Sequence, residues 1–243
     1  MRAPFSPEAA FDHDAFCRLV PVAVRMLDNV LDVTYWPLPQ QQDEAWSKRR
    51  IGLGFTGLGD ALVMLGLRYD SDEGRKFAAA VAQSLRDQAY RASIELAKEK
   101  GVPARIDPDK YLQSGFAKRL PEEIREGIRQ HGIRNSHLLS IAPTGTISLA
   151  FADNASNGIE PAFSWVYTRK KREPDGGVKE YMVEDHAYRV YRERGGDTTR
   201  LPESFVSALE ISAKDHLAMV AAVAPYIDTS ISKTVNVPVS CPY

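Results

Sequence analysis

Residues 138–148 read Leu-Leu-Ser-Ile-Ala-Pro-Thr-Gly-Thr-Ile-Ser, and this stretch decides the fold class. Its first five residues form a short apolar run of the kind that makes a buried strand. The hydroxyl-rich segment that follows predicts a loop at the carboxyl end of that strand, where α/β proteins usually place their ligands. The stretch therefore favours an α/β fold with a ligand site in the loop.

The loop has the composition of an anion-binding site. Gly145 lets the backbone approach an anion closely, and Thr144, Thr146 and Ser148 offer hydroxyl groups beside free backbone amides. A helix that started after Ser148 would add the favourable field of its amino-terminal amides. The Gly-Lys-Ser/Thr ending of a P-loop is absent. The residues alone leave both phosphate binding and an ordinary hydroxyl-rich turn open.

Helices are expected to dominate the rest of the chain. Apolar residues at helical spacing predict one helix over 14–34, and Pro21 should either kink it or move its start to Pro21. Ser71 is the expected N-cap of a second long helix over 72–100. Shorter helices are predicted over 61–65, 121–132, 184–193 and 212–223, a surface hairpin or excursion over 169–177, and a strand over 231–237.

A glycine-rich segment, Gly52-x-Gly54-x-x-Gly57, matches the dinucleotide-binding fingerprint letter for letter. That fingerprint needs a hydrophobic strand just before the glycines and an acidic residue about 20 residues later, at the end of the next strand. Here residues 45–50 do not read as a core strand, and the acidic cluster at 70–73 opens a helix. Close backbone packing and a tight turn are the preferred explanation, with a nucleotide cofactor as the alternative.

The composition is that of an ordinary globular domain. The chain has 243 residues, of which 44% are hydrophobic and 26% charged, and its formal net charge is -1. This balance does not indicate a nucleic-acid or membrane partner, and no apolar run is long enough to span a bilayer. The two cysteines, Cys17 and Cys241, form no metal-binding or disulfide pattern. We therefore expect a cytoplasmic protein with no metal site.

Four ordered motifs together resemble the catalytic subunit of ribonucleotide reductase. They are Arg-Met-Leu-Asp-Asn-Val at 25–30, Arg-Arg-Ile-Gly-Leu-Gly at 49–54, the stretch 140–148 followed by Gly-Ile-Glu-Pro at 158–161, and Ser-Lys-Thr-Val-Asn-Val-Pro at 232–238. The forms at 144–148 and 154–172 most resemble the adenosylcobalamin-dependent class. The resemblance implies a ten-stranded α/β barrel built from two five-stranded halves. Residues 1–243 would be one helix-rich domain, the carboxyl-terminal half of that barrel, incomplete at both ends.

The resemblance also implies roles for two loops. One would hold the phosphates of a ribonucleotide substrate, and it comprises Ala142, Pro143, Thr144, Gly145, Thr146, Ile147 and Ser148. The other would line the active site, and it comprises Gly158, Ile159, Glu160 and Pro161. Adenosylcobalamin would be the cofactor, bound mainly by the part of the barrel that this sequence lacks.

The residues that carry the family's radical chemistry are missing from this sequence. The family uses a thiyl radical on a cysteine within an Asn-Pro-Cys-Gly-Glu type motif, a nearby glutamate and a reducing cysteine pair. Neither Cys17 nor Cys241 has the flanking Asn and Glu, so no residue is predicted to be catalytic.

The expectation is a component of a ribonucleoside-diphosphate reductase, inactive alone, that makes deoxyribonucleotides with a companion chain carrying the radical cysteine. A truncated fragment and a non-catalytic accessory or regulatory module are the alternatives. In each case a half-barrel should expose unpaired strand edges and apolar surface.

Overall fold

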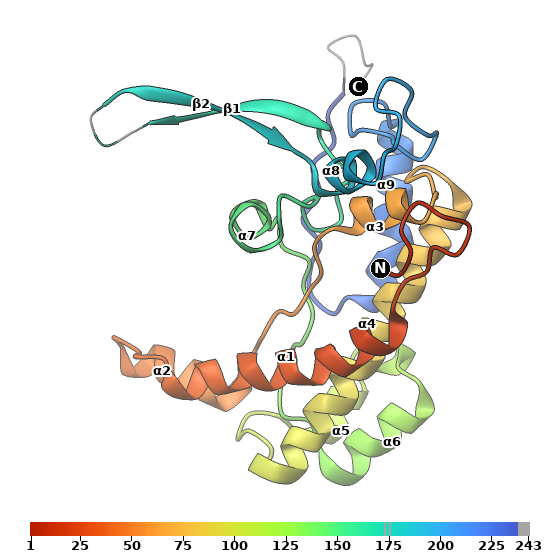
Figure 1. Ribbon diagram of the computed structural model, residues 1–243. Coiled ribbons are helices and arrows are strands. Elements are labelled where there is room, and N and C mark those ends of the chain that lie inside the picture. Colours follow the sequence, from red (N-terminus) through yellow and green to blue (C-terminus); the bar gives the residue numbers. More distant parts are fainter. Residues whose placement is uncertain (173, 175, 238–243) are drawn as a thin grey trace.

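The computed structural model describes residues 1–172, 174 and 176–237, and it is rich in helix (Figure 1). The helices are α1 (His13–Val33), α2 (Pro39–Lys48), α3 (Leu58–Met64), α4 (Asp72–Lys100), α5 (Pro108–Leu112), α6 (Glu122–His131), α7 (Gly145–Phe151), α8 (His186–Glu193) and α9 (Ala213–Val223), with 3-10 turns η1 (Ala117–Arg119) and η2 (Ala224–Tyr226). The strands β1 (Val166–Arg172) and β2 (Val178–Glu184) form an antiparallel hairpin.

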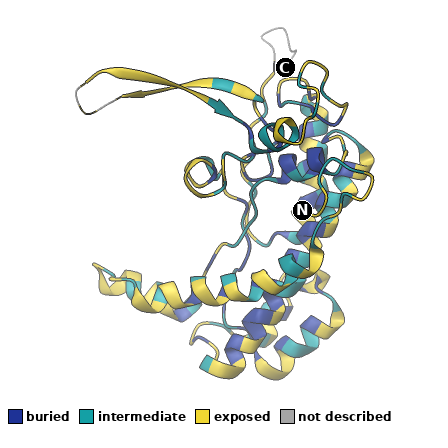
Figure 2. Ribbon diagram, in the orientation of Figure 1, coloured by how far each residue is buried: buried dark blue, intermediate teal, exposed yellow. Residues whose placement is uncertain are grey.

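The long helix α4 is the centre of the hydrophobic core. The Ser71 hydroxyl accepts a hydrogen bond from the Gly74 amide at 3.0 Å, which caps its first turn, and Gly101 ends it with a φ of +84°. Its buried residues recur every three or four positions, and α1, α6 and α9 pack against it (Figure 2). The predicted helix over 72–100 is confirmed.

The helix α1 begins at His13, because the Asp12 carboxylate accepts a hydrogen bond from the Ala15 amide at 3.1 Å. Pro21 therefore lies inside the helix, and the predicted alternative of a start at Pro21 is wrong. Burial of Val20 and Val24, on the side of α1 that packs on α4, offsets the backbone hydrogen bond that the proline removes.

Three short extended segments, 51–54, 138–141 and 230–232, lie side by side in parallel and form the nearest feature to a parallel sheet among the described residues. Backbone hydrogen bonds of 2.8–3.0 Å pair the segments. Between the first two, the amides of Ile51, Leu53 and Ser140 donate to the carbonyl oxygens of His137, Leu138 and Leu53, respectively. Between the second and third, the amides of Ile141 and Ser232 donate to the carbonyl oxygens of Ser230 and Ile141. The strand predicted over 138–142 is confirmed in part: Leu138, Leu139 and Ile141 are buried, but the pairing consists of isolated bridges at Leu139 and Ile141, and Ala142 is exposed. The strand predicted over 231–237 is wrong beyond Ser232, because the Thr234 amide donates to the Glu160 carboxylate instead.

The glycines of the fingerprint-like segment permit close contact between two of these segments. A Cβ at Gly52 would lie 2.4 Å from the Ser140 hydroxyl, and one at Gly54 would lie 2.2 Å from the Ser140 carbonyl oxygen. Gly57 adopts a φ of +78° and begins α3. The packing explanation of these glycines is confirmed.

The remaining sequence predictions agree with the structure in most places. The helix-rich character, the surface hairpin and the helices near 61–65, 121–132, 184–193 and 212–223 are confirmed, and α2 is a helix that the sequence did not predict. A half-barrel is not confirmed, since the described strands are β1 and β2, with parallel pairing limited to single bridges.

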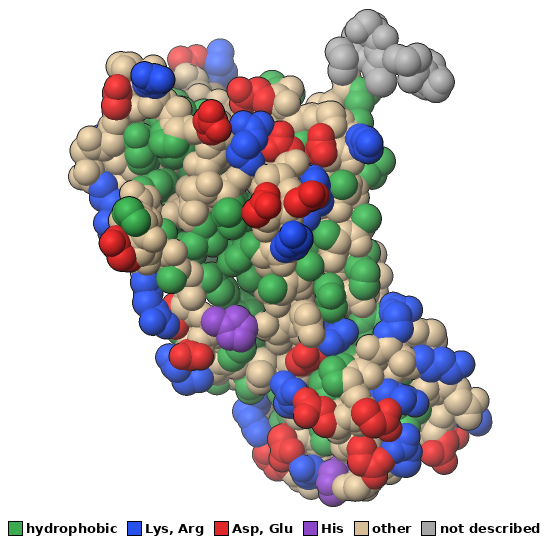
Figure 3. Space-filling model, turned by 90° about the vertical axis from the view of Figure 1, so that its right-hand side faces the viewer, with side chains coloured by type: hydrophobic (Ala, Val, Ile, Leu, Met, Phe, Trp, Pro, Cys, Tyr) green, Lys and Arg blue, Asp and Glu red, His purple; other side chains and the backbone are tan. Residues whose placement is uncertain are grey.

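Among the described helices, none is long and apolar enough to cross a bilayer. Figure 3 shows charged side chains of both signs spread over one face, with apolar side chains between them.

A buried ion pair joins α1 to the start of the first extended segment. The Asp28 side chain is fully buried, and its carboxylate accepts hydrogen bonds from Arg49 at 2.7 Å and from Asn135 at 3.1 Å. Arg49 also donates to Asp32 at 2.8 Å, at the exposed edge of the cluster. Burial opposes the charge of Asp28, but the hydrogen bond and charge of Arg49 outweigh it and hold the pKa below its usual value.

We expect Asp28→Asn to lower the free energy of unfolding by about 3–5 kcal/mol, because it leaves the buried Arg49 guanidinium without its main counter-charge. Asp32→Asn is the matched control: it removes a half-exposed partner of the same arginine and should cost about 1 kcal/mol or less. Urea denaturation of both variants measures the difference. Equal losses would contradict the assignment of Asp28 as the main counter-charge.

Candidate functional site

A cavity of about 910 Å³ brings together the two loops that the sequence singled out. Gly145 and Thr146 contribute from the first loop, and Glu160 and Pro161 from the second. The rest of its lining comes from residues 149, 154–157, 162–164, 167, 168, 185, 208, 234 and 236. The other residues of the two loops lie outside the lining: Ser148, Gly158 and Ile159 are buried, whereas Ala142, Pro143 and Ile147 are exposed.

The first loop differs from its predicted form, because a helix begins within it. The sequence predicted a loop through Ser148, but α7 starts at Gly145 and Thr144 is its N-cap, with a φ of +56°. No side chain caps α7, and among the described residues no hydrogen bond reaches the amides of Gly145, Thr146 or Ile147. Two of these three residues line the cavity, so the free amides lie at its edge.

Three hydroxyl and amide groups explain why α7 has no side-chain cap. The Thr56 hydroxyl donates to the Ser156 carbonyl oxygen at 2.9 Å, so it accepts from the Thr144 hydroxyl, 2.8 Å away. The Thr144 hydroxyl in turn accepts from the Gly158 amide at 2.8 Å. Thr144 therefore joins the two loops instead of capping its own helix. We call Thr56, Thr144 and Gly158 the hydroxyl cluster.

Close packing fixes the second loop against the first. Gly158 has a φ of +51°, and a Cβ at this position would lie 2.5 Å from the Ala142 carbonyl oxygen. The buried Ser148 hydroxyl donates to the Ala155 carbonyl oxygen, so it is used within the protein. Of the three hydroxyl groups predicted to face an anion, that of Thr146 belongs to a residue lining the cavity.

Glu160 is held by the segment that follows the third extended segment. Its carboxylate accepts hydrogen bonds from the Lys233 ammonium group and from the Thr234 amide, the latter at 2.6 Å. Burial lowers the pKa of Lys233, while the contact with Glu160 favours its charged form. The pair neutralises a carboxylate beside the cavity.

Two buried carboxylates converge where α8 begins. The Ala187 amide donates to Asp60 at 3.1 Å and to Asp185 at 3.0 Å, so the two carboxylates share one donor. Asp60 also accepts from the Ser156 amide at 2.8 Å. Burial raises the pKa of Asp185 to about 8, with the charge of Asp60 adding to the shift, and burial also raises the pKa of Asp60. Burial and the neighbouring charge therefore both favour the protonated form of the pair.

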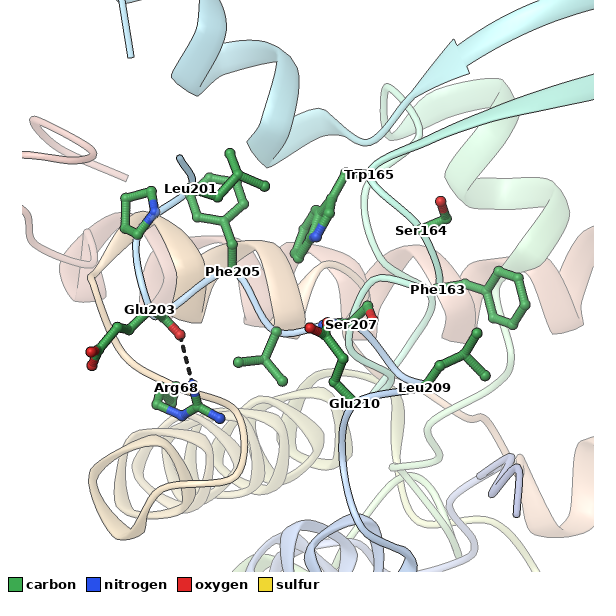
Figure 4. Close-up of a pocket in the computed structure, with 12 residues that line it drawn as sticks. Arg68, Phe163, Ser164, Trp165, Leu201, Glu203, Phe205, Ser207, Leu209 and Glu210 are labelled. Carbon is green, nitrogen blue, oxygen red and sulfur yellow. Dashed lines mark hydrogen bonds between the residues drawn. The ribbon is translucent and has the colours of Figure 1, made fainter. Parts of the chain in front are cut away.

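A second cavity, of about 690 Å³, lies on the other side of segment 162–165. Figure 4 shows its aromatic walls, including Trp165 and Phe205, with Phe163 and Leu209 at one side. Arg68 donates to the Glu203 carbonyl oxygen at 3.0 Å and is paired with Asp70. Gly145 and Thr146, whose amides have no hydrogen-bond partner among the described residues, line the larger cavity and not this one, so the larger cavity is the candidate site.

The sequence missed several residues that build the site. Thr56 lies between the glycines of the fingerprint-like segment, Asp60 and Ser156 lie outside the predicted site loops, and Lys233 lies in the motif at 232–238. A polar residue between glycines, as at Thr56, was an available signal. The partners of these side chains lie far along the chain, so their roles needed the fold.

Comparison with known proteins gives one consistent result. The family model described as "Ribonucleotide reductase, barrel domain" matches residues 2–243. A vitamin B12-dependent ribonucleoside-diphosphate reductase of Mycobacterium tuberculosis is 34% identical over 93% of this chain and 32% of its own length. One of Thermoplasma acidophilum is 31% identical over 93% of this chain and 29% of its own length. A ribonucleoside-diphosphate reductase subunit alpha of Chlamydia muridarum is 32% identical over 65% of this chain and 17% of its own.

We expect Asp185→Asn to change how stability depends on pH. The raised pKa of Asp185 means that the folded state binds a proton more tightly than the unfolded state, so its contribution is present below about pH 4 and is lost as pH rises through about 8. Asparagine caps α8 equally well and does not ionise. The variant should therefore gain stability relative to the wild type between pH 6 and pH 9, measured by urea denaturation.

Asp107→Asn is the control for that measurement. Asp107 is also a helix N-cap, at α5, but hydrogen bonds from backbone amides lower its pKa. Its replacement should leave the pH dependence between 6 and 9 like that of the wild type. A slope in Asp185→Asn equal to that of the wild type refutes the proton-sharing assignment.

We expect Thr56→Val to lower the free energy of unfolding by about 1–2 kcal/mol, because it removes the acceptor of the Thr144 hydroxyl without changing volume greatly. Thr56→Ser keeps the hydroxyl and should recover most of the loss. Thermal or urea unfolding compares the two. Destabilisation by Thr56→Ser with none by Thr56→Val would point to packing of the Thr56 methyl group rather than to the hydroxyl cluster.

Proposed function

This chain belongs to the ribonucleotide reductase barrel-domain family, and on that premise we propose that its larger cavity holds the phosphates of a ribonucleotide substrate. The chain spans about a third of the length of the B12-dependent relatives, 32% and 29%. The proposal is therefore for one component of a ribonucleoside-diphosphate reductase, which reduces ribonucleotides to deoxyribonucleotides as a complete enzyme.

The observation that carries the proposal is the uncapped start of α7 at the edge of this cavity. The amides of Gly145, Thr146 and Ile147 have no hydrogen-bond partner among the described residues. Gly145 has no side chain to keep a ligand away, and the space where its Cβ would lie is open. Phosphate oxygens are strong acceptors that suit converging amides and the Thr146 hydroxyl.

The charges around the cavity support an anionic ligand. Two acidic residues line it: Glu160 pairs with Lys233, and burial beside Asp60 raises the pKa of Asp185, which favours its uncharged form. A phosphate at α7 would therefore meet little repulsion from these carboxylates. Affinity would come from amide and hydroxyl dipoles in fixed positions rather than from a cluster of lysines or arginines.

We further propose that residues 1–243 form the carboxyl-terminal half of the family's barrel and need a companion segment for catalysis. In the family the radical cysteine is flanked by Asn and Glu, which neither Cys17 nor Cys241 has. Burial raises the pKa of the Cys17 thiol, which disfavours a reactive thiolate, and Cys241 lies outside the described residues. The cysteine that starts the reaction would come from the companion, whether a separate chain or another part of one polypeptide.

Two relatives are named vitamin B12-dependent ribonucleoside-diphosphate reductases. We therefore propose adenosylcobalamin as the cofactor of the complete enzyme, where it would supply the radical chemistry. A corrin ring needs a broad, flat contact surface. The larger cavity instead has small polar groups that converge, from Thr146, Asn157 and Ser164 among others. These residues do not fit a corrin ring, so we place the cofactor with the companion segment.

Gly145→Glu tests the phosphate site. The new carboxylate would accept hydrogen bonds from the amides at the start of α7 and so compete with phosphate. A negative charge at this end of a helix stabilises it by about 0.3–1 kcal/mol, so the variant should still fold. We expect the wild-type chain to bind a ribonucleoside diphosphate more tightly than the ribonucleoside, and the variant to bind the diphosphate at least about tenfold more weakly, without a lower melting temperature. Calorimetric titration measures both.

Gly115→Glu is the matched control, because Gly115 is exposed and the space beside it is equally open. It should bind the diphosphate as the wild type does. Equal affinity of the wild type for nucleoside and diphosphate overturns the phosphate site and favours a non-catalytic accessory module. Equal weakening by both glutamates shows a general effect of added charge and also counts against the site.

A further inference from the structure

One side of α1 is an apolar stripe that is largely exposed to solvent. Leu19, Val22, Met26, Val30 and Val33 lie three or four residues apart, and they are 47–82% exposed. Figure 2 shows exposed residues along the whole length of this helix. From Leu19 to Val33 the stripe is about 21 Å long at 1.5 Å per residue. Single exposed apolar residues are common, but a continuous row of this length marks a contact surface.

The other sides of α1 are already occupied, mainly by α4. Val20 and Val24 are buried on the side of α1 that packs on α4. On a flank of the stripe, Arg25 donates to Glu99 at 2.9 Å and Asn29 accepts from Lys100 at 2.6 Å, which ties that flank to the end of α4. The stripe is therefore a third side of the helix, and its exposure does not result from a loosely packed α1.

Two further features are available for contact with a partner: an apolar face of α7 and an unpaired edge of the first extended segment. On α7, Ile147 is 52% exposed and Phe151 is 87% exposed, one helical turn apart. In the first extended segment, no hydrogen bond reaches the amides of Gly52 or Gly54 among the described residues, so this edge can accept another strand. Figure 1 shows this segment running from α2, past α1, toward α3, with α7 beside it.

We propose that the stripe on α1 is the docking surface for the reductase segment that this chain does not include, the segment with the radical cysteine. This inference rests on the proposed function and names the surface that the companion uses. Most of the M. tuberculosis relative's sequence has no counterpart in this chain, although the chain itself is matched over 93% of its length. The missing part is thus a large folded partner.

A large partner accounts for more of the surface than a second copy of the chain does. Two α1 helices could bury their stripes against each other, but that contact would leave the strand edge at Gly52 and Gly54 and the apolar face of α7 uncovered. A folded segment with its own strand and apolar helix face can cover all three. We therefore assign the stripe to the companion segment, with self-association as an outcome of the test.

The test measures binding between this chain and the purified radical-cysteine segment of the same organism's reductase, by calorimetric titration and sedimentation velocity. Val22→Glu/Met26→Glu places two charges in the stripe and should weaken the complex at least about tenfold. Leu217→Glu is the matched control, because Leu217 is an equally exposed apolar residue, 60%, on α9. It should bind the segment as the wild type does.

Three results overturn the proposal. Binding of the segment by the double variant as tightly as by the wild type overturns it, and so does equal weakening of the complex by the Leu217→Glu control. The third result is that the wild type does not bind the segment but associates with itself, and that the double variant abolishes this self-association. That result would assign the stripe to a second copy of the chain.

Oxidative footprinting of the wild type gives an independent reading that needs no variant to fold. Met26 in the stripe is 61% exposed and Met182 on the hairpin is 78% exposed. Formation of the complex should protect Met26 from oxidation and leave Met182 reactive. Oxidation of Met26 at the same rate with and without the bound segment refutes the docking surface.

The same measurements separate this inference from the proposed function. Gly145→Glu should lose affinity for the diphosphate and still bind the segment. The double variant on α1 should keep its affinity for the diphosphate and lose the segment. Failure of the first pattern removes the phosphate site, and failure of the second removes the docking surface.

Discussion

The buried carboxylate of Asp28 is the constraint on which the site depends. A fully buried charge is costly unless it is paired and hydrogen-bonded. One carboxylate oxygen of Asp28 accepts hydrogen bonds from Arg49 and Asn135, and Arg134 and Lys100 lie 3.5 and 3.6 Å from the other oxygen. Arg49 lies two residues before the segment 51–54, and Asn135 lies three residues before 138–141, so one carboxylate fixes the starts of both. Asn135 also donates to the Arg49 carbonyl oxygen at 3.0 Å and is bonded to Ser93 of α4. The register of the parallel pair is thereby tied to the two longest helices.

That register decides what lies at the far ends of the two segments. Because Gly52 and Gly54 have no Cβ, the segment 51–54 approaches Ser140 closely. Two residues after Gly54, the chain places Thr56 within 2.8 Å of Thr144. The hydroxyl that could cap α7 is then used to join loops, and the amides of α7 stay free. The unpaired amides of α7 thus depend on packing between glycines and a serine as well as on the loop's own sequence.

The sequence could predict helices and loops whose signals lie within a few neighbouring residues. It could not predict features that depend on contacts between residues far apart in the chain. Helical spacing and a serine cap were sufficient for α4, and hydroxyl content with glycine was sufficient to select 142–148. The start of α7 was misplaced because Thr144 adopts a positive φ, which is uncommon for a threonine and is held here by Thr56 and Gly158. The Asp60–Asp185 pair was not found, because two carboxylates 125 positions apart meet only when α3 and α8 pack together.

The proposed phosphate site and the proposed docking surface need each other for a physical reason. Phosphates bound at the start of α7 would leave the ribose and base of a nucleotide to extend away from the helix. The exposed face of α7 and the open edge at Gly54 lie on either side of the hydroxyl cluster, and the described residues leave them uncovered. A radical reaction requires exclusion of water from the ribose. The surface that the companion covers is therefore expected to become a wall of the reaction chamber, and binding of substrate and of companion should be mutually favourable.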